Sequence, residues 1–395
     1  MRVGIDASRA NTKQKTGTEW YSFHVIQQLK NLIPEDIEVI LYSKEPLEGE
    51  LATIPSHWKS RVLSWPPQFL WTQLRLSVEL FLHKVDLLYI PAHTIPLIHP
   101  KKVVTVIHDV GFARQDNLYN HKHIGKSRFS KNVLNMLVRI FTLGKYGASE
   151  FDYHTFSVSL ALSANARIVT VSEFSKSEIQ DVYATPPHQI TVIPNGLNKR
   201  KSGNNASEIL RTYGITRPFI FYIGRVEEKK NIPALIEAFS LLRSTQGIDT
   251  QLVLAGQPGF GHERVMKNIS QYKLEDTVIQ TGWISEEDVA TLMSQAVVFV
   301  LPSLYEGFGI PILEAMNEGI PVACSDIPAL REVGGSAALF FDPNSATDMA
   351  NTIAKIMNTD SSKQITAGHA QAELFSWEQS GKATWELLRT ELELL

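Results

Sequence analysis

The chain has 395 residues, of which 44% are hydrophobic and 20% are charged, and these are ordinary values for a globular protein. This composition excludes wholesale disorder and collagen-like or coiled-coil rods, and the length predicts two or three domains. The single cysteine, Cys324, excludes an intramolecular disulfide. Together with the charged amino terminus and the lack of a long apolar run, this feature predicts a cytoplasmic protein.

The net charge of −3 is unevenly distributed along the chain. Residues 1–200 hold 23 Lys and Arg against 17 Asp and Glu, whereas residues 201–395 hold 15 against 24. A basic half on an acidic protein favours one face that meets an anionic surface, and an unevenness without function is the alternative.

Short apolar runs alternate with helical stretches from the beginning of the chain to its end. Because these runs are apolar throughout rather than alternating, they predict strands buried on both faces, as in parallel sheets. The runs cover 3–6, 39–42, 87–90, 103–107, 168–171 and 190–193 in the first half, and 219–223, 252–255, 278–281, 297–301, 321–324 and 338–341 in the second. The alternation predicts two doubly wound α/β domains, 1–200 and 201–377, joined by a polar linker over 198–205 and facing a deep cleft. Open sheets of this kind bind ligands beyond the carboxyl ends of their strands, so residues that follow strands are the candidates for function.

His108 is the first such candidate, since it follows the run 103–107. A histidine there could donate a hydrogen bond to a sugar hydroxyl, and a satisfied core histidine is an equal alternative.

A basic stretch comes next, because residues 117–149 contain no Asp or Glu. Its Lys and Arg residues are interleaved with apolar ones at loosely helical spacing. A basic amphipathic helix over 122–145 could lie on an anionic membrane, and a core-facing helix with a basic outer side is the alternative.

The segment from Gly224 to Asn231 follows a predicted strand and precedes a helix that Pro233 helps to start. Arg225 and Lys230 could close on a diphosphate from this one loop, since Arg supplies a planar fork and Lys a point charge. A solvated charged turn is the alternative interpretation.

The most informative stretch runs from Pro302 to Met316, where a strand ends, a glycine-containing loop follows and a helix begins near Pro311. Backbone amides at such a helix start form an anion site, and the glycines let a ligand approach closely. Two carboxylates flank the site, Glu306 in the loop and Glu314 in the expected first helical turn. For Glu314 alone, a favourable interaction with the helix dipole is a sufficient explanation.

Together these motifs resemble the family-4 group of retaining glycosyltransferases, which has the GT-B fold of two Rossmann-like doubly wound parallel-sheet domains. Glu306 and Glu314 match the family's paired glutamates, spaced E-x7-E, and the segment 224–231 matches its G-R-x4-K-N motif. His108 matches the family's histidine in the N-terminal domain. The resemblance covers most of the chain and is densest between residues 224 and 343.

The resemblance implies a role for each matching residue. Arg225 and Lys230 would stabilise a diphosphate leaving group, Glu314 would accept hydrogen bonds from a ribose, and Glu306 would hold the transferred sugar. His108 would contact that sugar from the first domain. Gly17 would lie near phosphate or acceptor, although Thr16–Glu19 has one glycine where many members have two. Backbone amides near the diphosphate or sugar would come from Phe308, Gly309, Ile310 and Leu313.

No Asp-x-Asp pair of the kind that holds a metal in other transferases occurs in the chain, so we predict no catalytic metal and no cofactor besides the donor substrate. The acids at 286–288 are read as a helix start or solvated surface. Residues 378–395 resemble the family's closing helix and are expected to pack back on the first domain.

The motifs and the resemblance together predict a metal-independent hexosyltransferase of mannose or glucose type, and the resemblance implies that it retains the anomeric configuration. It would use a nucleotide diphosphate sugar and a saccharide or lipid-linked saccharide acceptor in surface polysaccharide synthesis, in the cytoplasm or peripherally on the inner membrane face. A nucleotide-sugar epimerase, a phosphorylase and a non-catalytic nucleotide-sugar-binding protein are the alternatives. No nucleic-acid partner is expected, and the donor base, acceptor and oligomeric state are not specified by the sequence.

Overall fold

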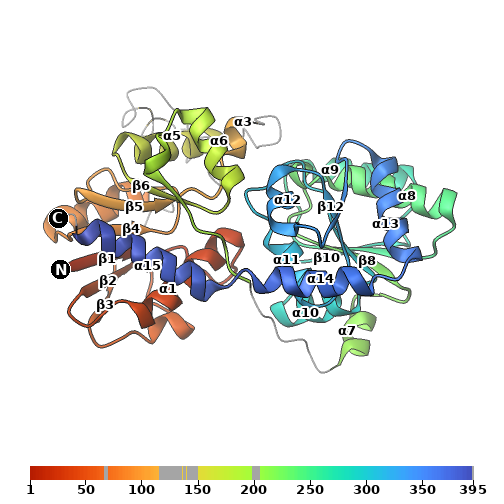
Figure 1. Ribbon diagram of the computed structural model, residues 1–395, viewed down its shortest axis with the longest axis horizontal. Helices are drawn as coiled ribbons and strands as arrows, with labels where there is room; N and C mark the ends of the chain where they lie inside the picture. Colours follow the sequence, from red (N-terminus) through yellow and green to blue (C-terminus); the bar gives the residue numbers. More distant parts are fainter. Residues whose placement is uncertain (66–69, 115–135, 137–138, 140–149, 198–204, 394–395) are drawn as a thin grey trace. The chain divides into compact units, whose positions relative to one another are not determined.

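The computed structural model describes residues 1–65, 70–114, 136, 139, 150–197 and 205–393 (Figure 1). The chain divides into two compact units. The first comprises Met1–Gly196 together with Ser376–Leu395, and the second comprises Leu197–Phe375. None of the helices in the described ranges combines the length and hydropathy that a membrane crossing requires.

The described part of the first unit forms a seven-stranded sheet with the order β3-β2-β1-β4-β5-β6-β7, and every pair is parallel. Its strands are β1 (Arg2–Asp6), β2 (Glu38–Ser43), β3 (Trp58–Val62), β4 (Leu87–Ile90), β5 (Lys102–Val106), β6 (Arg167–Thr170) and β7 (Ile190–Val192). Its helices are α1 (Gly17–Leu32), α2 (Ser77–Leu82), α3 (Gly111–Arg114), α5 (Glu150–Ser163), α6 (Glu173–Tyr183) and α15 (Trp377–Glu393), with single turns η1 (Gly49–Ala52), η2 (Trp71–Leu76) and η4 (Pro187–Gln189).

The second unit holds a six-stranded parallel sheet in its described residues, with the order β10-β9-β8-β11-β12-β13. Its strands are β8 (Phe219–Ile223), β9 (Gln251–Ala255), β10 (Val278–Gly282), β11 (Val298–Leu301), β12 (Val322–Ser325) and β13 (Leu339–Phe341). Its helices are α7 (Ala206–Thr212), η5 (Glu228–Lys230), α8 (Ile232–Gln246), α9 (His262–Gln271), α10 (Glu286–Gln295), α11 (Ile310–Asn317), α12 (Pro328–Gly334), α13 (Ala346–Asn358) and α14 (Ser362–Glu373).

The predicted fold class is confirmed, because each apolar run predicted as a strand lies in one of these two parallel sheets. The prediction missed β3, in which Trp58 is buried and the four residues that follow are exposed or half-buried. This strand pairs only with β2 at the sheet edge, so one side faces solvent and its sequence lacks an apolar run.

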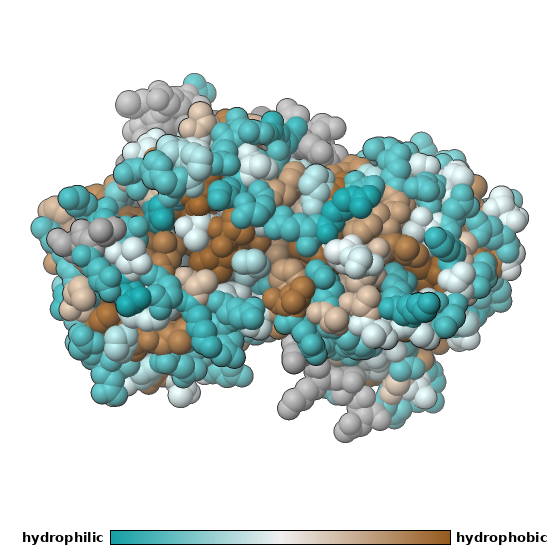
Figure 2. Space-filling model, in the orientation of Figure 1, coloured by the Kyte–Doolittle hydropathy of each residue, from teal (hydrophilic) through white to brown (hydrophobic). Residues whose placement is uncertain are grey.

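Each unit separates its apolar core from a polar surface. The central strands β8 and β11 of the second unit bury Phe221 and Phe299 completely. On the face seen in Figure 2, hydrophilic side chains cover most of this unit, and smaller apolar areas lie between them.

Each sheet has one point at which the strand order reverses. In the first unit the chain builds β1, β2 and β3 outward and then returns to place β4 beside β1. In the second unit it builds β8, β9 and β10 and then returns to place β11 beside β8. The loops that follow β1 and β4, and those that follow β8 and β11, therefore flank the crevices where open α/β sheets bind ligands.

The last helix, α15, returns to the first unit and lies beside α1 (Figure 1). The helices approach closely at Gly381, where an added Cβ would lie 2.3 Å from Cβ of Gln28. The entry to α15 is equally tight, since a Cβ on Gly196 would lie 2.1 Å from the backbone nitrogen of Trp377. Glycine at both positions lets α15 pack on this unit.

Two sequence predictions lie outside the described residues. One is the basic stretch 122–145, of which only Met136 and Arg139 are described, both exposed. The other is the linker 198–205, of which only Asn205 is described. Asn205 caps α7 by accepting a hydrogen bond from the Glu208 amide at 3.2 Å.

Candidate active site

The loop after β8 carries the two cations of the G-R-x4-K-N motif. Gly224 has a φ of +147°, a conformation that favours glycine, and its amide still pairs with the Ala255 carbonyl at 2.9 Å. The Arg225 side chain is 60% exposed, with Nε 3.4 Å from a carboxylate oxygen of Glu227. The hydroxyl of buried Tyr222 donates to the Arg225 carbonyl at 2.8 Å, which holds this loop in place. Burial first, and then the carboxylates of Glu306 and Glu227, raises the pKa of Tyr222 well above its ordinary value, so the hydroxyl keeps its proton.

The second cation, Lys230, meets the loop after β11. Its Nζ lies 2.6 Å from Oε1 of Glu306, and the Ser303 hydroxyl donates to the same oxygen at 2.6 Å. The Lys230 and Glu306 side chains are 21% and 13% exposed, so the ion pair is largely but not fully removed from water. The Leu304 amide also donates to the Lys229 carbonyl at 3.0 Å. Two segments whose contacting residues are 76 positions apart in sequence therefore meet at the crevice between β8 and β11.

The glycine-containing loop ends at the start of α11. Gly309 precedes the helix with a φ of +112°, and a Cβ there would lie 2.5 Å from a methyl group of Leu330. The side chain of Phe308 packs edge-on against Phe375, with ring centres 5.6 Å apart. Ile310 is the first helical residue and is half-buried, whereas Leu313 is fully buried and could offer a ligand only its backbone.

The prediction for Glu314 needs a correction. The helix begins at Ile310 rather than Pro311, which places Glu314 beyond the first turn, and the first turn contains no acidic residue. The helix dipole falls off within a turn, so it does not account for this carboxylate. Glu314 is nonetheless only 4% exposed. Burying a carboxylate costs free energy unless hydrogen-bond or ionic partners offset that cost, so the buried position of Glu314 calls for an explanation other than the helix dipole.

Sequence reasoning missed a third loop, 256–261, which follows β9. Its backbone pairs with the motif loop after β8: the Val226 amide donates to Gln257, and the Gly259 amide donates to Val226, both at 2.9 Å. Gly256 has a φ of +144°, and a Cβ there would lie 1.9 Å from the Gly224 carbonyl oxygen. The signal was present, since glycines at 256, 259 and 261 directly follow a predicted strand.

In the first unit, His108 follows β5 at the carboxyl edge of the sheet. Tyr21 of α1 packs edge-on against its ring at 4.8 Å, and the Ser175 hydroxyl donates to its carbonyl at 3.1 Å. Burial lowers the pKa of His108 to about 4, so the imidazole is neutral near pH 7. Its Nε2 has no hydrogen-bond partner among the described residues.

Gly17 is the first residue of α1 rather than a loop residue. An added Cβ would meet no atom within 4 Å, so the surroundings do not demand glycine there. The helix start is already occupied by an acid, because the Thr16 amide donates to the Glu19 carboxylate at 3.1 Å. Arg9, from the loop after β1, also lies 3.5 Å from Glu19.

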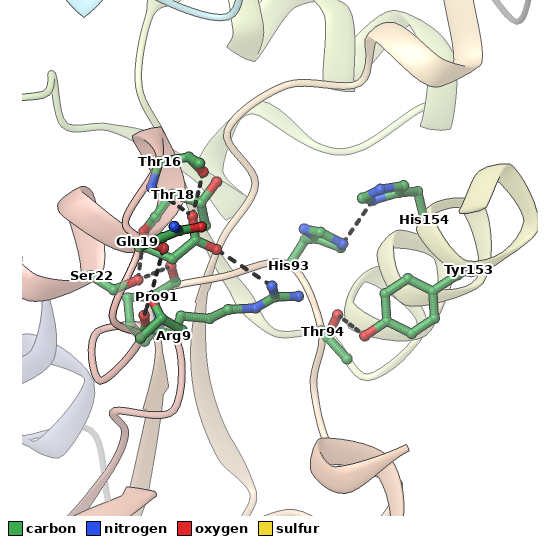
Figure 3. A network of polar contacts seen from close by, with 12 residues as sticks. Arg9, Thr16, Thr18, Glu19, Ser22, Pro91, His93, Thr94, Tyr153 and His154 are labelled. Carbon is green, nitrogen blue, oxygen red and sulfur yellow. Dashed lines mark hydrogen bonds and ion pairs between the residues drawn. The ribbon is translucent and has the colours of Figure 1, made fainter. Parts of the chain in front are cut away.

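A histidine pair that the sequence analysis did not single out lies at the same edge. His93 follows β4, and its Nε2 lies 2.9 Å from Nδ1 of His154 on α5. Nearby, the hydroxyls of Thr94 and Tyr153 lie 3.0 Å apart. Figure 3 shows the Arg9 side chain extending from the loop after β1 toward the loop that carries His93 and Thr94. Burial, followed by the charges of His154 and Arg9, lowers the pKa of His93 well below its ordinary value.

The predicted site residues thus fall into two groups. Arg225, Lys230 and Glu306 lie on loops that flank the reversal point of the second sheet, and the segment 308–314 continues from the same loop into α11. His108 and Gly17 lie in the first unit. In the described ranges, no three His, Cys, Asp or Glu side chains group so that they could hold a metal ion.

The two units are both Rossmann-like parallel sheets, and each has polar loops at its reversal point, where open α/β sheets bind ligands. Comparison with known proteins identifies the family. The family model described as Glycosyltransferase Family 4 matches residues 17–201, and the one described as Glycosyl transferases group 1 matches residues 208–371. The chain belongs to glycosyltransferase family 4 and is a glycosyltransferase with the GT-B fold.

Among curated relatives, the chain is 31% identical to O-antigen chain mannosyltransferase B of Escherichia coli over 291 residues, which cover 71% of this chain and 75% of that protein. It is 24% identical to O-antigen chain mannosyltransferase RfbU of Salmonella typhimurium over 357 residues, which cover 87% and 88% of the two chains. It also matches the serotype-specific mannosyltransferase WbdA of Escherichia coli at 27% identity, but over only 33% of WbdA.

Among solved structures, sucrose-phosphate synthase from Thermosynechococcus elongatus matches with a TM-score of 0.71 at 18% identity, covering 100% of both chains. Anabaena HepE in complex with UDP and glucose matches with a TM-score of 0.69 at 17% identity, covering 99% of this chain and 100% of that one. At these identities the likeness is one of fold.

Proposed function

We propose that this glycosyltransferase transfers a hexose, mannose in particular, from a nucleotide diphosphate sugar to a saccharide or lipid-linked saccharide, with retention and without a metal. The observation that carries the proposal is the contact between Lys230 and Glu306 at the reversal point of the second sheet. In this contact, a cation that can bind phosphate lies beside a carboxylate that can accept hydrogen bonds from sugar hydroxyls, and both lie in one crevice. The predicted domain roles belong to the same proposal: residues 201–377 bind the donor, and residues 1–200 with helix 378–395 bind the acceptor.

The donor chemistry follows from the charges of the second unit. When the bond between the anomeric carbon and the phosphate oxygen breaks, negative charge develops on the diphosphate. Arg225 and Lys230 would stabilise this charge together with backbone amides at the start of α11. Glu306, held by Ser303, would accept hydrogen bonds from the hexose hydroxyls, and Glu314 would accept them from the ribose. In a same-face reaction the acceptor oxygen bonds to the anomeric carbon, and its proton passes to the departing phosphate.

The acceptor side is assigned to the polar edge of the first sheet. The loops after β1 and β4 bring Arg9 and His93 to that sheet's own reversal point, and the first turn of α1 adds Glu19 beside Arg9. Such mixed donors and acceptors suit a polyhydroxylated ligand. Neutral His108 has an unpartnered Nε2 and could exchange a hydrogen bond with a sugar hydroxyl without adding positive charge.

The choice of mannose and of a surface polysaccharide rests on the curated relatives, two of which are named O-antigen chain mannosyltransferases. A nucleotide sugar donor is supported by the HepE structure, which contains UDP and glucose. If this chain transfers mannose to a saccharide of the O-antigen type, it catalyses the same class of reaction as these two relatives.

The test is a donor screen followed by product analysis. Purified protein is incubated with GDP-mannose or UDP-hexoses and with mannoside acceptors, and products are resolved by mass spectrometry and NMR. We expect an α-linked disaccharide and one nucleoside diphosphate for each bond formed. Altered donor without acceptor would indicate an epimerase, dependence on free phosphate would indicate a phosphorylase, and donor binding without diphosphate release would indicate a non-catalytic protein; each result contradicts the proposal.

A further inference from the structure

The described surface of the first unit contains an unusual concentration of exposed apolar side chains. Val78, Phe81 and Leu82 of α2 are 52%, 64% and 64% exposed. They follow the i, i+3, i+4 spacing that places side chains on one side of a helix. The opposite side of α2 carries Leu80, which is buried in the core.

A second segment extends this face. Leu97 and Ile98, in the connection between β4 and β5, are 37% and 47% exposed. The Ile98 amide donates to the Ser77 hydroxyl at the start of α2 at 3.1 Å, and the Leu97 amide donates to the Gln73 carbonyl of η2 at 3.4 Å. These hydrogen bonds join the connection to η2 and α2. We call the five side chains of Val78, Phe81, Leu82, Leu97 and Ile98 the α2 face.

The surroundings of the α2 face carry more positive than negative charge. Segments 59–62, 75–84 and 97–102 together contain six Lys and Arg residues and a single acid, Glu79, although the whole chain has a net charge of −3. Glu79 is buried and shared among Arg61 at 2.7 Å, His83 at 3.1 Å and Arg75 at 3.5 Å. Lys59 pairs with Glu38 at 2.5 Å and Lys102 pairs with Glu391 at 3.3 Å. Lys84 and Lys101 beside the face are exposed and form no ion pair among the described residues, so they leave positive charge next to the apolar side chains.

The combination of apolar and basic groups on the α2 face indicates whether its partner is a protein or a lipid bilayer. Lysine is depleted in protein–protein interfaces relative to the rest of the surface, whereas interfacial helices join an apolar side to flanking Lys and Arg. Each cation near an anionic leaflet adds about 1 kcal/mol, or about fivefold in affinity. We propose that the α2 face is a docking surface for an anionic lipid bilayer, into which Phe81 and Leu82 insert.

This site differs from the predicted contact over 122–145 and goes beyond the proposed transfer reaction. The carboxyl-terminal end of α2 lies at the amino edge of the sheet, because the Lys84 carbonyl accepts a hydrogen bond from Arg2 at the start of β1. The candidate acceptor residues lie at the carboxyl edge. Bilayer binding can therefore be tested separately from catalysis.

The experiment is co-sedimentation of the full-length protein with vesicles of phosphatidylcholine alone or with about one-third phosphatidylglycerol. We expect binding only to the anionic vesicles, weakened by salt as exposed charges are screened. A Phe81→Ser/Leu82→Ser variant should bind at least tenfold more weakly, and Lys84→Glu/Lys101→Glu should bind far more weakly than wild type. The matched control is Met266→Ser, which removes a side chain 45% exposed on the second unit and should leave binding unchanged.

Circular dichroism and the thermal midpoint confirm that each variant is folded, and donor turnover in the absence of vesicles should be unchanged in all of them. The proposal is overturned if wild type binds neither vesicle, or if folded Phe81→Ser/Leu82→Ser sediments as wild type does. It is also overturned if light scattering shows that the α2 face instead joins two copies of the chain and that the double substitution separates them.

Discussion

Replacing Lys230 by methionine removes one charge from the candidate site while keeping a side chain of similar length. In the structure, Lys230 pairs with Glu306 at 2.6 Å, and Ser303 remains as a second partner of that carboxylate. The variant therefore leaves Glu306 with a hydrogen bond but removes the cation proposed to stabilise the departing diphosphate.

Two magnitudes separate a catalytic role from a structural one. The pair is 21% and 13% exposed, intermediate between surface and buried ion pairs, so its loss should lower the free energy of unfolding by about 1–2 kcal/mol. Loss of one group that stabilises transition-state charge should lower kcat about 10²–10³-fold, or about 2.7–4 kcal/mol in the barrier. The catalytic effect should therefore exceed the stability effect.

The assay measures kcat from the initial rate of nucleoside diphosphate release at saturating donor, and thermal unfolding monitors stability. The matched control is Arg217→Met, which breaks an exposed ion pair with Asp249 at 2.8 Å in the same unit and should leave kcat unchanged. If Lys230→Met is folded and retains kcat within about threefold of wild type, transition-state stabilisation by this cation is refuted.

Three further predictions address the nucleotide, the loops and pH. Glu314→Gln should raise the dissociation constant of the nucleoside diphosphate about tenfold or more, as expected for a lost hydrogen bond to a charged group, whereas Glu318→Gln at the end of α11 should not. Gly256→Ala should destabilise the protein by about 3 kcal/mol or more in chemical unfolding, because its Cβ would lie 1.9 Å from a carbonyl oxygen, whereas Gly247→Ala, with no atom within 4 Å, should cost about 1 kcal/mol. His24 is stacked on Trp377 with ring centres 4.9 Å apart, and burial lowers its pKa from 6.5 to about 4. Between pH 6.5 and 4 the unfolded chain therefore binds more protons than the folded one, so the free energy of unfolding should fall as the pH drops through this range. The limiting slope is about 1.4 kcal/mol per pH unit, and His24→Phe should make the pH dependence shallower.

Each of these predictions has a clear contrary result. Equal nucleotide affinity in Glu314→Gln and wild type would remove the ribose assignment. Equal stability losses for Gly256→Ala and Gly247→Ala would show that the loops after β8 and β9 are not in tight contact. A stability profile of His24→Phe parallel to that of wild type would show that His24 does not titrate as described.

The sheets could be predicted because their strands are buried on both faces and therefore read as continuous apolar runs. The edge strand β3 was not predicted, since four of its five residues are exposed or half-buried and it contains no apolar run. Helix boundaries were predicted less accurately than the strands. The start of α11 lies one residue earlier than predicted, and this small shift changes the explanation of Glu314, because a dipole argument applies only within the first turn.

The candidate site was predictable where a motif follows a strand, as for Lys230 and Glu306. Their direct contact was not predictable, because it depends on β8 and β11 being neighbours in a sheet whose strand order reverses between them. The His93–His154 pair was missed because it depends on how α5 packs beside the loop after β4. The two residues are 61 positions apart in sequence, and neither belongs to a recognisable motif.

The central claim is that the positive charge of the loop after β8, at the crevice between β8 and β11, binds the outer phosphate of a nucleotide. Isothermal titration with nucleoside monophosphates and diphosphates tests it most directly, since the two ligands differ only in that phosphate. Wild type should bind the diphosphate at least tenfold more tightly, and Lys230→Met should lose most of this difference while binding the monophosphate as before. An undiminished preference for the diphosphate in a folded Lys230→Met variant would contradict the account.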